Sequence, residues 1–223
     1  AGMHRFVWDV HYQPIAGAGG GGRGGLPIQG IPHNSPSAAT TPWVPPESYT
    51  VTLTAGGRSY SQPITVQQDP RVTTPQAVMQ QVYALTDAMY FGAVETQAAA
   101  AAAASMREQA KQIQAQGGAA EALGAFVQKL AALEGQPQAP AAGGRGGGPG
   151  RGEAPPASAP GTLRSAATQL AAQMNAMQAA DVAPTANTLA AVTAALRAGD
   201  DVMARWAALL SKDLAGLNAT LKA

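Results

Sequence analysis

The chain has 223 residues, with 14 basic and 13 acidic side chains, a net charge of +1 and no cysteine. Its basic residues are scattered, so they offer no electrostatic footprint for nucleic acid or anionic lipid. The absence of cysteine excludes a disulfide framework, a thiolate nucleophile and cysteine-ligated metals. No stretch is apolar enough to cross a bilayer, because the alanine run at residues 98–104 is short and weakly hydrophobic.

The first element expected is a strand over residues 3–10. Phe6, Trp8 and Val10 alternate along it, which predicts an interior strand with one side well covered. Residues 15–43 follow as a Gly- and Pro-rich loop insert. Trp43, at its end, is interpreted as an aromatic anchor against the strands rather than as a ligand contact.

A β-hairpin is predicted next, and it carries the clearest pattern in the chain. Tyr49, Val51 and Leu53 alternate with threonines, which predicts one face on a core and one face in solvent. Gly56-Gly57 supplies a tight turn, and Tyr60, Ile64 and Val66 resume the alternation. Pro63 cannot donate to a ladder, so the return strand is expected to be an edge or bulged. Two strands alone bury too little, and the hairpin must therefore pack on something else.

Helical periodicity replaces the strand pattern after residue 70. Thr74-Pro75 is expected to cap a helix of about 40 residues, which ends at Gly117-Gly118. A second helix is predicted over residues 121–134, a third around Leu163 to Met177, and a fourth from Pro184 onward. A break in the fourth helix is considered near Gly199, because glycine costs about 1 kcal/mol there relative to alanine. Trp206 is expected to point inward against the long helix.

The strand segments also resemble a known protein family. The matching residues are Pro45-Pro46, Tyr49-Thr50-Val51, Gln62-Pro63-Ile64-Thr65-Val66 and Asp69-Pro70-Arg71-Val72, with weaker matches at residues 2–10, 183–185 and 205–209. This pattern resembles the C-terminal region of bacterial sortilin-like, BNR-repeat β-propeller proteins, which are often labelled glycosyl hydrolase-like. Glu47-Ser48 stands where a glycine usually precedes the tyrosine, and no propeller is present. The resemblance implies a fibronectin- or immunoglobulin-like sandwich followed by helices.

The expected fold class is therefore α+β. Residues 1–70 form a partial fibronectin/Ig-like β-sandwich with the insert at 15–43, and residues 71–134 form the long helix and the second helix. Residues 135–161 form a Gly/Pro/Arg-rich flexible linker, and residues 162–223 form a helical hairpin that packs on 71–134. Three expected strands are fewer than the seven or so of such a sandwich. We therefore expect either preceding strands in a precursor or cover from a partner.

The chemistry of an enzyme is missing from these elements. His4 and His11 are seven apart, which places them on opposite faces of a strand, so they do not make a metal site. Asp9 and Glu47 give no paired-carboxylate arrangement for sugar hydrolysis. The helical acids are interpreted as solvated faces or end charges; they are Asp87, Glu95, Glu108, Asp200, Asp201 and Asp213. We predict no catalytic residue, no cofactor and no metal.

Two functions stay open on the sequence. The preferred one is a non-catalytic, extracytoplasmic interaction module, an accessory or scaffolding subunit that docks on a larger assembly of the cell envelope and reaches the membrane only through partners. The alternative is a carbohydrate-binding appendage of a secreted propeller protein. The candidate rings for a sugar platform are Trp8, Trp43, Tyr12, Tyr49 and Tyr60. Trp8, Tyr49 and Tyr60 fit the alternation of a buried core, which leaves too few rings for a sugar-binding surface. The candidate partner contacts are Phe6, Trp8, Trp43 and Trp206.

Overall fold

The structure is a computed structural model, and it describes residues 8, 10–13, 15, 41–117, 119–136 and 161–222. Its elements, in chain order, are β1 (Ser48–Ala55), β2 (Arg58–Thr65), α1 (Gln76–Ala115), α2 (Ala120–Glu134), α3 (Leu163–Met177), α4 (Ala186–Ala208), the π-helical turn η1 (Leu209–Leu214) and α5 (Ala215–Lys222). The described chain is a helical bundle with one two-stranded antiparallel sheet. The expected β-sandwich is therefore wrong.

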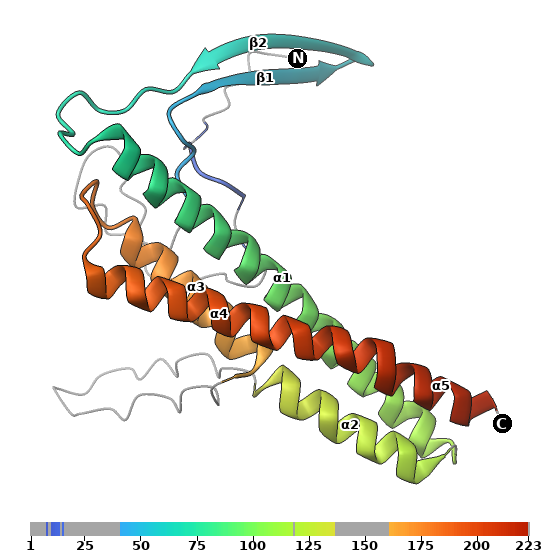
Figure 1. Cartoon of the computed structure of the whole chain (residues 1–223). Coiled ribbons are helices and arrows are strands. Elements are labelled where there is room, and N and C mark those ends of the chain that lie inside the picture. Colours follow the sequence, from blue (N-terminus) through green and yellow to red (C-terminus); the bar gives the residue numbers. More distant parts are fainter. Residues whose placement is uncertain are drawn as a thin grey trace, which may run out of the picture.

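Helix α1 is the element on which α2, α3 and α4 pack (Figure 1). Its first half contributes Val82, Met89 and Tyr90 to a core shared with Leu170 of α3 and Val192 of α4. Its second half forms another core with α2, α3, α4, η1 and α5. At 40 residues and about 1.5 Å per residue, α1 is long enough to carry both cores end to end.

The second core is built on the alanine run of α1. Ala99, Ala100 and Ala103 are buried there against Phe126 of α2 and Trp206 of α4. Alanine has little apolar area to bury, so large side chains from the neighbouring helices must supply most of the core. Trp206 is one of these, and its predicted inward position is confirmed.

Two glycines let three helices approach closely around Leu170 of α3. A Cβ atom added at Gly92 of α1, or at Gly199 of α4, comes to 3.2 Å from Leu170 Cδ1. Both glycines therefore leave room for one leucine methyl group. The break considered near Gly199 is absent, because α4 continues through it to Ala208.

The π-helical turn η1 keeps the end of the last helix in phase with the core. Leu209 and Leu217 are both buried, but they are eight positions apart. Two turns of α-helix take only about seven residues, so in an uninterrupted α-helix Leu217 would lie about 80° around the axis from Leu209, at the margin of the buried face. A π turn absorbs one extra residue and returns Leu217 to the face of Leu209.

A buried carboxylate ties three helices together at the end of α2. Glu134 has 0% exposure, and its two oxygens accept from two arginines. Arg107 Nη1 of α1 lies 2.6 Å from Oε2, and Arg164 Nη2 of α3 lies 2.7 Å from Oε1. A buried carboxylate needs this kind of pairing, because desolvation without it is costly.

The hairpin has the predicted turn and register, but its apolar face is not covered. Leu53 pairs with Tyr60 and Tyr49 with Ile64, while Gly56 and Gly57 take positive φ values of 57° and 75° at the turn. Both strands are edges in the described chain, so Pro63 can be accommodated although it has no N–H to donate. The register is unbroken, so no bulge is present. The expectation that this face lies on a core is wrong, because no hairpin residue belongs to either core.

The other expected features near the N-terminus also change. Val10 has a positive φ of 57°, and neither Trp8 nor Val10 lies in a strand. The rest of that expected strand, most of the loop insert and most of the 135–161 linker lie outside the described residues. Thr74 does not cap α1; its hydroxyl donates instead to the Asp181 carbonyl at 2.6 Å.

The Leu170 contact can be tested with a double-mutant cycle. Gly199→Ala should stabilise a Leu170→Ala background by about 1 kcal/mol through helix propensity, but should gain clearly less in the wild type, where the new methyl meets Leu170. Leu170→Ala alone should cost about 2 to 5 kcal/mol. Denaturant unfolding measures all four proteins. Gly216→Ala is the control, because nothing lies near its Cβ position; equal Gly199→Ala effects in both backgrounds would contradict the contact.

The Glu134 pairing predicts an asymmetric loss of stability. Replacing Arg107 and Arg164 together with methionine leaves a buried, uncompensated carboxylate and should cost about 3 to 5 kcal/mol in unfolding free energy. Replacing Lys129, whose bridge to Asp213 at 2.5 Å is largely exposed, should cost at most about 1 kcal/mol. Similar losses for the two cases would show that Glu134 does not depend on its arginines.

Candidate binding pocket

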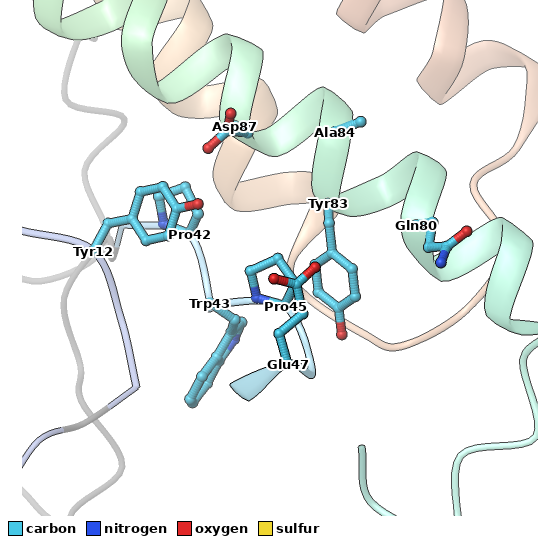
Figure 2. Close-up of a pocket in the computed structure, with 9 residues that line it drawn as sticks. All are labelled: Tyr12, Pro42, Trp43, Pro45, Glu47, Gln80, Tyr83, Ala84 and Asp87. Carbon is cyan, nitrogen blue, oxygen red and sulfur yellow. The ribbon is translucent and has the colours of Figure 1, made fainter. Parts of the chain in front are cut away.

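One face of α1 forms the floor of a pocket of about 360 Å³. Its α1 residues recur at helical spacing; they are Gln80, Tyr83, Ala84 and Asp87. Residues three and four apart lie on the same helix face, so these four side chains share one surface. The remaining lining comes from the chain before β1: Tyr12, Pro42, Trp43, Pro45 and Glu47 (Figure 2). We call this space the α1 pocket.

Backbone hydrogen bonds hold the two loop segments of the α1 pocket together. Tyr12 N donates to Pro42 O at 3.0 Å, and Val44 N donates to Val10 O at 2.9 Å. The Thr41 hydroxyl donates to Tyr12 O at 2.6 Å. Residues 10–13 and 41–44 are thus held side by side although about 30 positions separate them in the sequence.

Two further hydrogen bonds fasten these segments to the helices. The Tyr90 hydroxyl of α1 donates to Gln13 O at 2.9 Å, and Trp43 N donates to Gln178 Oε1, just past α3, at 3.0 Å. Tyr12 also stands edge-on to Tyr90, with ring centroids 5.3 Å apart. The pocket wall is therefore built on the helical bundle and not on the hairpin.

Trp43 lies at the pocket with its ring partly in solvent. It is 44% exposed, and one side of the ring rests against His11, with centroids 3.7 Å apart. The expectation that Trp43 anchors a sandwich core is wrong. In Figure 2 its ring projects from the loop beside Pro45, on the same side of α1 as the Tyr83 ring.

The electrostatics of the pocket are negative. Burial raises the pKa of Tyr12 to about 12, helped by a hydrogen bond to the Asp87 carboxylate and by the charges of Asp87 and Glu47. Burial first, then the Glu47 charge, also raises the pKa of Tyr49. Burial and the Asp181 charge raise the pKa of Tyr83. Each shift keeps the phenol neutral, so the two carboxylates supply the charge of the lining.

The structure separates the four candidate partner contacts. Trp8 is half-buried, edge-on to Tyr49 at 5.6 Å between centroids, and Trp43 is exposed at the pocket. Trp206 lies in the core, so it is not a surface for partners. Phe6 lies outside the described residues.

Sequence reasoning missed the role of Asp87. We interpreted it as part of a solvated helix face, whereas it lies in the pocket and accepts from Tyr12. The spacing of Gln80, Tyr83 and Asp87 marks one helix face, but it does not show that a loop lies over that face. Glu47, set among prolines and next to the hairpin, was noted only as a possible hydrolytic acid, and it forms the opposite wall.

The described residues form neither a metal-binding cluster nor a membrane-spanning helix. Within those ranges, no three His, Asp or Glu side chains come together as metal ligands. None of the helices there combines the length and the hydropathy that a membrane crossing requires.

The Tyr12 environment gives a testable pH dependence. Because the folded protein holds this proton up to about pH 12 and the unfolded chain releases it near pH 10.0, the resulting stabilisation is complete below pH 10 and is lost as the pH rises toward 12. Ultraviolet titration of phenolate absorbance should show one tyrosine that ionises near pH 12, and Tyr12→Phe should remove that step. Its persistence in Tyr12→Phe would assign the step to another of the five tyrosines.

Comparison with known proteins identifies no relative of the chain. No family model matches the chain, and neither the curated proteins nor the solved structures contain a significant match. The resemblance to sortilin-like propeller proteins stays a prediction from the residues, and function has to be argued from the surface and the pocket.

Proposed function

We propose that the chain is a non-catalytic protein-interaction module, whose docking surface is the apolar side of the hairpin. This hairpin face consists of Tyr49, Val51, Leu53, Tyr60 and Ile64. Its last four side chains are 42% to 62% exposed, and this exposure is the observation that carries the proposal. Contiguous exposed apolar side chains on one face are typical of an interaction site.

The position of the hairpin supports docking rather than a role in the fold. The opposite side is polar, with Thr52 and Thr54 bonded to Ser61 and Ser59 across the strands at 3.1 and 3.0 Å. The apolar face also carries Gln62, opposite Val51, and the exposed Arg58, opposite Ala55 next to the turn. A two-stranded sheet gains little stability alone, so burial against another protein would stabilise it.

The chemistry of the face defines the partner. We expect a protein with an apolar surface opposite Val51, Leu53, Tyr60 and Ile64, because a charged group buried among these side chains would have no counter-charge. The outer edges of β1 and β2 have no neighbouring strand in the described chain, so the partner can add main-chain hydrogen bonds by strand addition. In the cell envelope, which the family resemblance favours, this module would act as an accessory or scaffolding subunit.

The aromatic rings favour this function over the carbohydrate-binding alternative. Trp8 and Tyr49 pack on each other, and Tyr12 packs on Tyr90. A sugar platform needs rings that are open on one face and share a plane. Among the candidate rings, Trp43 and Tyr60 are the exposed ones, and they belong to different surfaces, the α1 pocket and the hairpin face.

A photo-crosslinking amino acid at position 53 tests the docking surface. In cells that make the full chain, position 53 should crosslink to another protein, whereas position 52, on the polar side of the same strand, should not. With the partner purified, Leu53→Thr with Tyr60→Thr should weaken binding at least about tenfold, the effect of losing one well-buried contact.

This double substitution should leave the stability of the helical bundle unchanged, because the hairpin contributes to neither core. Thr52→Ala is the control and should bind normally. Equal crosslinking from positions 52 and 53, or undiminished binding of the double variant, would contradict the proposal. Crosslinks only to a second copy of the chain would make the partner that copy.

A further inference from the structure

The α1 pocket holds two carboxylates that no basic residue neutralises within the described chain. Asp87 accepts from the neutral Tyr12 hydroxyl, and no ion pair among the described residues involves Glu47. The six salt bridges in the described parts of the chain involve other acids. The chain as a whole has a net charge of +1, so the negative field here is local.

Apart from Gln80 and Ala84, the remaining residues that line the pocket carry aromatic or proline rings. Trp43 extends from the loop and Tyr83 from α1, and Pro45 lies between the two rings next to the Glu47 carboxylate (Figure 2). Aromatic faces attract positive charge through their quadrupole, and indole does so best. The walls therefore favour the same sign of ligand charge as the carboxylates do, by an independent interaction.

The raised pKa values of the neighbouring phenols agree with this reading. Behind burial and the Asp87 hydrogen bond, the charges of Asp87 and Glu47 both act on Tyr12, and the Glu47 charge also acts on Tyr49. Two carboxylates from different elements thus act on the same volume. That volume, about 360 Å³, lies toward the small end of ligand sites and suits a compact head group.

We propose that the α1 pocket binds a positively charged organic group, a guanidinium or an alkylammonium. Its N–H groups donate to Asp87 and Glu47, while its apolar part lies against Trp43, Tyr83 and Pro45. An organic cation fits better than a bare metal ion, because the lining offers two carboxylates set among rings and no third acidic or imidazole ligand. The cation can come from a basic side chain of a protein or from a free small amine.

Titration of the isotope-labelled full chain by NMR tests the ligand class. The probe is N-acetyl-arginine methylamide, and the matched neutral probe is the citrulline compound of the same shape. The arginine probe should shift the Trp43 indole signal and the amides of residues 80–87, and the citrulline probe should bind at least about tenfold more weakly. Equal binding of the two probes, or no shift at any concentration of the arginine probe, would overturn the proposal.

Isosteric variants test the residues. Glu47→Gln and Asp87→Asn should each weaken arginine-probe binding several-fold, with unchanged circular dichroism and melting temperature. Glu95→Gln is the control, since it removes an exposed carboxylate from the same helix outside the pocket. Binding that Glu47→Gln and Asp87→Asn leave unchanged, or that Glu95→Gln weakens equally, would place the probe elsewhere.

Two further probes separate the sources of the cation. If a Gly-Gly-Arg-Gly-Gly peptide binds more tightly than the isolated arginine probe, the site takes a side chain of a protein. If tetramethylammonium binds and the peptide does not, the site takes a small free cation. Both outcomes support the pocket. Neither depends on the hairpin face, so failure here leaves the proposed docking function standing, and the Leu53→Thr and Tyr60→Thr variant should bind the arginine probe normally.

Discussion

The bundle depends on one ion-paired carboxylate more than on any other single polar interaction. Glu134 ends α2 inside the protein, where it would be costly to bury if Arg107 and Arg164 did not reach it from α1 and α3. Each oxygen accepts from an arginine of a different helix, so a change in the relative placement of the three helices at this end would break at least one of the two pairs. Apolar packing among alanines is less selective, since methyl groups fit in several registers. The polar cluster therefore supplies a specificity that the surrounding core lacks.

The two cores along α1 solve different packing problems. The first uses Met89, Leu170 and Met174, and gains apolar area from large, flexible side chains. The second uses the alanine run, and gains close helix approach at the expense of area. Phe126, Leu130 and Trp206 compensate from the opposite helices, and the π turn keeps Leu217 in contact at the end. A single long helix can join both cores because its alanine run, residues 98–104, is confined to the second half.

The spacing of apolar residues and the positions of glycine and proline were enough to predict the helices and the hairpin turn. The spacing of apolar residues placed both ends of α1 and α2 and the starts of α3 and α4 within about two residues, but it did not predict the π turn that follows α4, and Gly56-Gly57 marked the turn of the hairpin. Alternation along β1 showed that Val51 and Leu53 share a face, but alternation does not show what covers that face. The cover was therefore taken from the family resemblance, which implied a β-sandwich. The described chain contains no second sheet that could form one.

The candidate site was harder to predict, because it depends on contacts between distant segments. Asp87 looks solvated on its helix, and only the placement of residues 10–13 and 41–44 turns that face into a pocket. The Glu134 pairs have the same character, since Arg107 lies 27 positions before it and Arg164 lies 30 positions after it. The spacing of residues within one helix does not predict ion pairs between distant segments, and the net charge of the chain does not reveal them either.

The Glu134 cluster also closes the base of the chain segment between α2 and α3. Gly135 takes a positive φ of 81° directly against Thr162, so closely that an added Cβ atom would come to 2.4 Å from Thr162 Oγ1. The two ends of residues 136–161 are thus fixed to each other by the bundle itself. Doubling the length of a loop whose ends are already joined costs only about 0.6 kcal/mol. The loop entropy of this segment therefore sets only a weak limit on its length, and a domain inserted between residues 136 and 161 would leave the contacts of the helices unchanged.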